Sequence, residues 1–179
     1  KLFAHEPAMN QPTDLALSPV SDYVYASDPN WKASTGKLWL IKPNGKVILL
    51  AENTGTTNGI EVSPDGRTLY VGESAQRKLW KYDIRQDGTL SNKQLFYSFH
   101  DYGMDGMRCD KKGNLYLTRY GKGTIVILSP EGSLLEEIPL KGKKPSNLTF
   151  GGKDRKRCYV TLADRGCFEY FDTDFPGRE

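Results

Sequence analysis

Four residues with oxygen-bearing side chains open four similar segments of the sequence, and these starts lie 45, 47 and 41 residues apart: Thr13, Asn58, Asp105 and Ser146. Asn58 offers an amide carbonyl oxygen and Asp105 a carboxylate. Oxygen donors on separate rigid strands suit a hard cation such as Ca²⁺ or Mg²⁺. We therefore take Asn58 and Asp105 as candidate metal ligands. Taken singly, Asn58-Gly59 and Asp105-Gly106 are also common turn dipeptides, so a purely structural role is the alternative.

The elements that would position these residues form an internal repeat. Each of the four segments reads as a short strand, a turn and a second strand, and the turn at Pro64-Asp65-Gly66 has the residues that tight turns require. A second hairpin follows each segment, although the last copy keeps only the strand at 167–171. Two hairpins per repeat predict a four-stranded antiparallel sheet, the blade of a β-propeller. We therefore expect an all-β fold of about four blades with almost no helix, and an irregular β-sandwich is the alternative.

Composition excludes several other classes of protein. The chain has 179 residues, of which 37% are hydrophobic and 26% charged, as in globular proteins. No apolar run approaches the ~20 residues that a membrane helix needs. Lys plus Arg number 25 and Asp plus Glu 22, and a net charge of +3 is too small to predict nucleic-acid binding. We expect neither a membrane nor a nucleic-acid partner.

Cysteine and histidine are too sparse for a Cys/His zinc site. The cysteines are Cys109, Cys158 and Cys167, and the histidines are His5 and His100. Three cysteines make no disulfide framework, although Cys158 and Cys167 could face each other across a hairpin; free thiols are the favoured interpretation. This usage favours a reducing compartment, so we expect a cytoplasmic protein, and a periplasmic or secreted one if an export signal precedes Lys1.

Several motifs together resemble the senescence-marker-protein/gluconolactonase/luciferin-regenerating-enzyme family. The resemblance covers nearly the whole chain, and its motifs are the segments 57–66, 69–71, 104–116, 145–152 and 174–178. It implies a six-bladed propeller with a divalent metal on its axis. On that basis residues 1–179 are expected to form a single propeller domain that lacks its opening blades; a closed four-bladed ring is the alternative. Open blade edges would then be covered by a second chain or fragment.

The resemblance also implies a function, which is hydrolysis of a sugar-type lactone with a divalent metal. Asp105 would serve as metal ligand and general base, and Asn58 as the second ligand. The substrate-binding candidates are Thr13, Asp14, Ser146 and Asn147. Ca²⁺ is the expected cation, with Mg²⁺, Zn²⁺ and Mn²⁺ as alternatives. The family adds a Glu ligand from its first blade, and no residue of this chain matches it.

Two departures from the family keep other functions open. Thr13 stands where family enzymes commonly have Asn, and Gln11 stands where animal gluconolactonases carry a substrate-binding Arg. They favour a non-catalytic propeller that binds a small molecule or a partner. A related phosphotriesterase-like or strictosidine-synthase-like activity is a further alternative. Asp14 and Asp28 either lie near the channel or fix turns through side-chain hydrogen bonds to the backbone.

Overall fold

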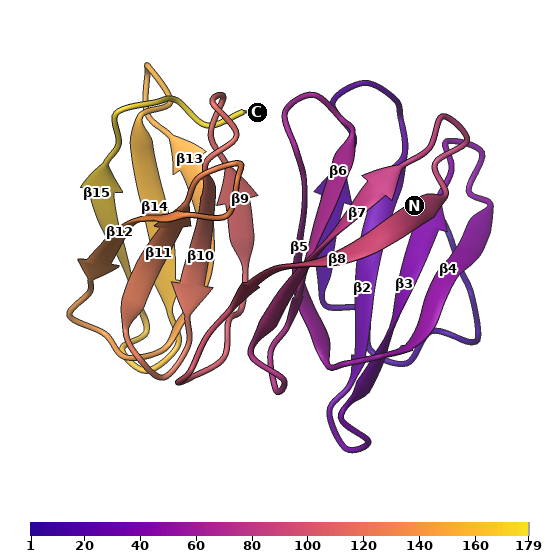
Figure 1. Ribbon diagram of the computed structural model, residues 1–179, viewed down its shortest axis with the longest axis horizontal. Helices are drawn as coiled ribbons and strands as arrows, with labels where there is room; N and C mark the ends of the chain where they lie inside the picture. The colour runs from indigo at the N-terminus through magenta and orange to yellow at the C-terminus, as the bar shows by residue number, and fades with distance from the viewer. Residues whose placement is uncertain (179) are drawn as a thin grey trace. The chain divides into compact units, whose positions relative to one another are not determined.

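Strands account for all of the regular secondary structure in the computed structural model, which describes residues 1–178 (Figure 1). The chain forms two compact units, one over Lys1–Ser98 and one from Phe99 onward, and each is described by itself. None of the described residues belongs to a helix that could span a bilayer. The all-β expectation is confirmed, and the single domain over 1–179 stays a prediction.

The first unit holds two antiparallel four-stranded sheets, each with its strands in chain order. Blade 1 comprises β1 (Asp14–Leu17), β2 (Val24–Asn30), β3 (Thr35–Ile41) and β4 (Val47–Thr54). Blade 2 comprises β5 (Thr57–Val62), β6 (Thr68–Glu73), β7 (Lys78–Ile84) and β8 (Leu90–Ser98). The first strands of the two blades, β1 and β5, lie side by side. Both predicted hairpin pairs are confirmed.

The two blades of this unit pack face to face over one apolar cluster. Blade 1 contributes Tyr25 and Leu40 and blade 2 contributes Ile60 and Leu69, all fully buried. Period-two alternation sends these side chains to the shared face. The Tyr25 hydroxyl donates to the carbonyl oxygen of Gly88 at 3.1 Å, so the only polar group of this buried ring is satisfied by the neighbouring blade.

The turn predicted at Pro64-Asp65-Gly66 depends on its glycine for two reasons. Gly66 has a φ of +72°, which L side chains rarely adopt, and a Cβ there would lie 2.4 Å from Cγ2 of Val20. The Asp65 carboxylate accepts hydrogen bonds from the Ser63 hydroxyl and the Arg67 amide, and these bonds hold its pKa below the usual range. The turn therefore closes the β5–β6 hairpin and packs against blade 1.

The second unit holds one four-stranded sheet and one three-stranded sheet, again antiparallel and in chain order. Blade 3 comprises β9 (Met107–Cys109), β10 (Leu115–Arg119), β11 (Thr124–Leu128) and β12 (Leu134–Pro139). Blade 4 comprises β13 (Pro145–Gly151), β14 (Arg157–Leu162) and β15 (Cys167–Asp172). The incomplete last copy expected from the sequence is therefore a sheet in which, among residues 1–178, no strand pairs with the outer edge of β15.

Blades 3 and 4 share a second apolar cluster. Tyr116 and Ile125 from blade 3 meet Leu148 and Val160 from blade 4, and the Tyr116 ring makes an edge contact with the ring of Phe150. The first strands of both blades lie side by side, and the amide of Gly106, just before β9, donates to the carbonyl oxygen of Ser146 on β13 at 3.0 Å. In both units, consecutive blades thus place their first strands side by side.

Candidate functional site

The start of blade 1 carries Thr13 and Asp14. Thr13 is exposed, and its amide donates to the carbonyl oxygen of Ser27 at 3.0 Å. The Asp14 carboxylate accepts the Leu15 amide at 3.0 Å and the Ile60 amide at 3.3 Å. Asp14 therefore ties β1 to β5 and helps to fix the strand on which Asn58 lies. Its predicted contact with substrate stays a prediction.

Asn58 lies at an irregular point of β5. The register between β5 and β6 shifts between Thr57 and Ile60, a local bulge that bends the strand where Asn58 and Gly59 stand. The Asn58 side chain is 6% exposed, and its Nδ2 donates to the Ser74 hydroxyl at 3.2 Å. This bond fixes the plane of the amide and leaves Oδ1 as the atom that can accept a hydrogen bond or ligate a cation.

Asp105 stands just before β9, half-buried. Its amide donates to the carbonyl oxygen of Thr118 at 3.1 Å, and the Thr118 amide donates back to the carbonyl oxygen of Gly106 at 3.0 Å. This reciprocal pair extends the β9–β10 ladder past the end of the strand. The backbone that presents the Asp105 carboxylate is therefore fixed by two hydrogen bonds to blade 3.

Ser146 and Asn147 lie against the Asp105 segment. A Cβ on Gly106 would meet Oδ1 of Asn147 at 2.2 Å, so only a glycine leaves room for that side chain. Oδ1 of Asn147 also accepts the Leu148 amide at 2.9 Å, and the hydroxyls of Ser146 and Thr161 are 2.8 Å apart. The β13–β14 register shifts at this point as well. The second unit thus brings together three predicted site residues: Asp105, Ser146 and Asn147.

The predicted residues form two groups, one in each unit. Thr13, Asp14 and Asn58 belong to the first unit, and Asp105, Ser146 and Asn147 to the second. Because the two metal-ligand candidates, Asn58 and Asp105, belong to different units, their joint binding of one cation stays a prediction.

The donor chemistry of these residues fits a hard cation in kind. The Asn58 amide oxygen and the Asp105 carboxylate are both ligands that Ca²⁺ accepts, but Ca²⁺ takes about 6–8 oxygens in all. Among residues 1–178 no group of three or more His, Cys, Asp or Glu side chains is placed to hold a metal. The oxygens of Asn58 and Asp105 are thus compatible with calcium, but they are too few to complete its coordination shell.

Asp28 fixes the main chain through side-chain hydrogen bonds, which was one of the two roles considered for it. Its side chain is 1% exposed and accepts three N–H groups: those of Asn10 at 3.0 Å, Gln11 at 2.6 Å and Trp39 Nε1 at 3.0 Å. Three donors satisfy a carboxylate that burial would otherwise penalise. A pocket of about 280 Å³ lies beside it, lined in part by Asn30.

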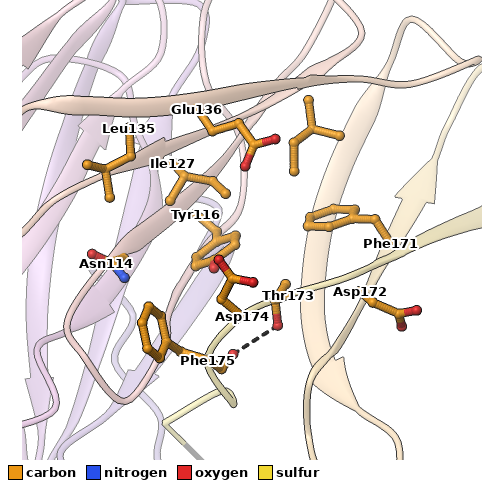
Figure 2. Close-up of a pocket in the computed structure, with 11 residues that line it drawn as sticks. Asn114, Tyr116, Ile127, Leu135, Glu136, Phe171, Asp172, Thr173, Asp174 and Phe175 are labelled. Atoms are coloured by element: carbon orange, nitrogen blue, oxygen red, sulfur yellow. Dashed lines mark hydrogen bonds between the residues drawn. The ribbon is translucent and has the colours of Figure 1, made fainter.

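A pocket in the second unit lies away from the predicted residues (Figure 2). Its volume is about 300 Å³, and it opens between β12 and β15, with the rings of Tyr116, Phe171 and Phe175 and the carboxylates of Glu136 and Asp174 around it. Burial, assisted by the nearby Asp110 carboxylate, raises the pKa of Tyr116 above its ordinary value. None of the sequence-predicted site residues lines this pocket.

Antiparallel sheets that pack face to face in chain order, with their first strands side by side, are the blades of a β-propeller protein. The family model of the SMP-30/Gluconolactonase/LRE-like region matches residues 5–164. The chain therefore belongs to the SMP-30/gluconolactonase/LRE-like family, which confirms the resemblance seen in the sequence.

Two curated relatives and one solved structure illustrate the likeness. A 6-deoxy-6-sulfogluconolactonase of Pseudomonas putida is 28% identical over 129 residues, which is 70% of this chain and 44% of that protein. A gluconolactonase of Zymomonas mobilis is 31% identical over 166 residues, or 80% of this chain and 46% of that protein. The structure of a calcium-binding protein, regucalcin, from Agrobacterium tumefaciens has a TM-score of 0.80 at 22% identity, covering 93% of this chain and 62% of that one. The chain thus spans about half the length of the curated relatives it matches.

Proposed function

We propose that the whole protein containing this chain is a metal-dependent lactonase that opens a sugar-type lactone. The observation that carries the proposal is the pair Asn58 and Asp105, an amide and a carboxylate at equivalent positions of two repeats, in a chain of this family. Relatives named gluconolactonase and 6-deoxy-6-sulfogluconolactonase support the substrate class. A structural relative described as calcium-binding supports a divalent cation, and Ca²⁺ foremost.

In this proposal Asn58 Oδ1 and the Asp105 carboxylate hold the cation. When bound, a divalent cation polarises a carbonyl and makes a nearby water more acidic. The Asp105 carboxylate accepts a proton from the water that attacks the lactone carbonyl carbon. The ring C–O bond then breaks, the released ring oxygen takes up a proton, and the product is an open-chain hydroxy acid. Thr13, Ser146 and the Asn147 amide, together with Asp14, bind the hydroxyl groups of the substrate.

The test is hydrolysis of glucono-1,5-lactone by the whole protein with and without EDTA. We expect EDTA to abolish activity and added Ca²⁺ to restore it. Asp105→Ala should lower kcat/KM by on the order of 10²–10⁴-fold, because both a ligand and the base are lost. The matched control is Asp172→Asn, which alters an exposed carboxylate paired with Arg157 at 2.8 Å and should keep full activity. Full metal-dependent activity in the Asp105→Ala variant would overturn the assignment.

A second candidate is a non-catalytic propeller that binds a small molecule. The observation that favours it is the side-chain set at the strand starts, where Gln11 and Thr13 replace the Arg and Asn implied by the resemblance and only Asp105 among the two ligand candidates carries charge. In that case the whole protein would bind sugar acids or lactones without turning them over. Calorimetric binding of glucono-1,5-lactone with no hydrolysis, in the presence of Ca²⁺, would favour this candidate.

We also propose that a further extended segment, from the same protein or a second chain, covers blade 4. Within the described part of the chain β15 has an unpaired edge, and Phe168 and Tyr170 on it are 74% and 61% exposed. In blade 2 the corresponding place beside the third strand is filled by β8, whose Leu90 packs on the core. Beside β15 there is instead the pocket of Figure 2. An antiparallel strand with alternating apolar side chains has the shape and chemistry to fill it.

A further inference from the structure

In every repeat, a side chain from elsewhere in the same blade forms a hydrogen bond with the main chain two residues before the repeat starts. In three of the four blades this side chain is an acceptor that binds main-chain N–H groups. The bonds run from the Gln11 amide to Asp28 at 2.6 Å, from the Thr56 amide to Gln76 at 2.8 Å, and from the Lys144 amide to Asp164 at 3.1 Å. Gln11, Thr56 and Lys144 precede Thr13, Asn58 and Ser146 by two residues. All three acceptors come from the end of the second strand or the turn that follows it.

In blade 3 the side chain at the end of the second strand is a hydrogen-bond donor instead of an acceptor. Arg119, the last residue of β10, is 1% exposed, and it donates where the other three accept. Its Nε binds the carbonyl oxygen of Gly103 at 3.2 Å, and its Nη2 binds those of Asp101 at 2.6 Å and Tyr102 at 3.2 Å. Gly103 precedes Asp105 by two residues. A planar guanidinium can gather three successive carbonyls in this way, and a lysine ammonium cannot match the geometry.

Two further contacts hold the Arg119 side chain in place. Its Nη2 also binds Oδ1 of Asp101 at 2.8 Å, and the guanidinium lies 3.6 Å from the centre of the Phe99 ring. The hydrogen bond from Arg119 holds the pKa of the Asp101 carboxyl below its usual range. The ion pair, the three carbonyls and the aromatic face offset the cost of burying the guanidinium charge. These contacts also hold the guanidinium in one orientation.

The segment that Arg119 holds is strained. Tyr102 has a φ of +38°, in the left-handed region that non-glycine residues seldom occupy, and its side chain is 52% exposed. Such a conformation persists only where surrounding contacts enforce it. The guanidinium binds the carbonyls of Asp101, Tyr102 and Gly103, on both sides of the strained residue. Asp105 therefore lies between the Gly103 carbonyl fixed by Arg119 and the Thr118 carbonyl that binds its own amide.

We propose that Arg119 is the positioning residue for the carboxylate of Asp105, by holding residues 101–103 in their strained conformation. The role of Asp105 as ligand and base rests on the proposed function. The positioning of its segment by Arg119 rests on the geometry alone. Arg157 has a comparable ion pair with Asp172 and a cation–π contact with Tyr170 at 4.4 Å, but it is only half-buried and distant in sequence from either candidate ligand, so the inference does not extend to it.

The experiment compares four variants of the whole protein: Arg119→Met, Arg119→Lys, the control Arg157→Met and the core control Ile125→Val. Backbone hydrogen exchange of residues 99–106 is measured first, then Ca²⁺ affinity by calorimetry, then kcat and KM for glucono-1,5-lactone. We expect Arg119→Met to speed exchange in 99–106 by about 10-fold or more, to weaken Ca²⁺ binding, and to lower kcat by on the order of 10–100-fold with KM changed less, because small displacements of a reacting group are costly. Arg119→Lys should recover part of each effect.

The controls separate positioning from simple loss of stability. Ile125 is fully buried in the same unit, so Ile125→Val should lower Tm while leaving Ca²⁺ affinity and kcat near wild type. Wild-type exchange in 99–106 together with wild-type Ca²⁺ affinity in Arg119→Met would overturn the inference; if that variant does not fold, Arg119→Lys decides by the same two measurements. If the wild-type protein has no lactonase activity, the proposed function fails, and exchange and Ca²⁺ affinity still decide the role of Arg119.

Discussion

At the scale of single residues, hydrogen bonds fix the Asn58 side chain and the main chain at Asp105. The Asn58 amide is oriented by Ser74, and the Asp105 backbone is tied to Thr118 on the adjacent strand. Fixed side chains lose little conformational entropy when a ligand binds, and this favours both ligation and catalysis. Burial of single residues also determines which thiol groups are reactive.

The cysteines provide a test of burial at this scale. Burial raises the pKa of the Cys158 thiol to about 12, and its side chain is fully buried, whereas Cys167 is half-buried. Because the thiolate is the reactive form, we expect iodoacetamide at pH 8 to label Cys167 at least about 100-fold faster than Cys158. Peptide mass spectrometry over time measures both rates in one sample. Equal labelling rates under native conditions would contradict the burial of Cys158, and labelling in denaturant supplies the reference.

The residues that start the repeats could be predicted from the sequence, but the side chains that fix the main chain before them could not. The oxygen donors at 13, 58, 105 and 146 are visible because they recur at nearly constant spacing. The partners of Asp28 and Arg119 lie 11 to 18 residues away along the chain and follow no fixed spacing rule. One signal was available for Arg119: it follows the segment 115–118, which starts with the apolar run Leu115-Tyr116-Leu117, and a charge at the end of a buried strand must be compensated.

At the scale of strands and turns, the hairpins follow from local sequence. Turn residues such as Pro64-Asp65-Gly66 and the alternation of apolar residues determine where each strand ends. The bulges near Asn58 and Ser146 could not be predicted, because they arise from the mismatch of two paired strands. Both bulges fall where the candidate residues stand.

Asp164 provides the test at this scale. Its carboxylate accepts the amides of Lys143 and Lys144 at 2.8 and 3.1 Å, and these hydrogen bonds hold its pKa below the usual range. A lowered folded-state pKa gives stability that is fully present above the unfolded pKa of about 3.9 and is lost as pH falls through the folded value. We expect Asp164→Asn to lower Tm by about 2 °C at pH 7 and by less at pH 2.5.

The control for this prediction is Asp22→Asn, which changes an exposed carboxylate in the loop between β1 and β2. It should leave Tm unchanged at both pH values. A Tm difference between wild type and Asp164→Asn that stays constant from pH 7 to pH 2.5 would contradict the part played by the ionised carboxylate. Thermal unfolding followed by circular dichroism at the two pH values is sufficient.

At the scale of the whole molecule, the repeats and the family determine the architecture. Residues 1–178 form three four-stranded blades and one three-stranded blade, and the chain spans about half the length of the curated relatives it matches. The number of blades was predictable from the repeat spacing. The exposure of Phe168 and Tyr170 on β15 was predictable only as an open edge, because the last repeat shows one strand where the other repeats show a second hairpin.

Blade 4 leads to a prediction about association. Expressed alone, residues 1–179 should self-associate through Phe168 and Tyr170, which are among the most exposed apolar side chains. The double variant Phe168→Ser/Tyr170→Ser should shift the chain toward monomer in size-exclusion chromatography with light scattering. Leu2→Ser, at a residue 78% exposed and outside any sheet, is the control and should change nothing. Undiminished association of the double variant would rule out this face.

Calorimetric titration of the whole protein with Ca²⁺ tests most directly whether Asn58 and Asp105 share one cation. We predict a single site in the wild-type protein, an affinity lower by on the order of 100-fold in Asp105→Asn, a smaller loss in Asn58→Ala, and no change in Asp172→Asn. Absence of binding to the wild-type protein, or wild-type affinity in both Asn58→Ala and Asp105→Asn, would contradict the metal site and the hydrolysis that depends on it.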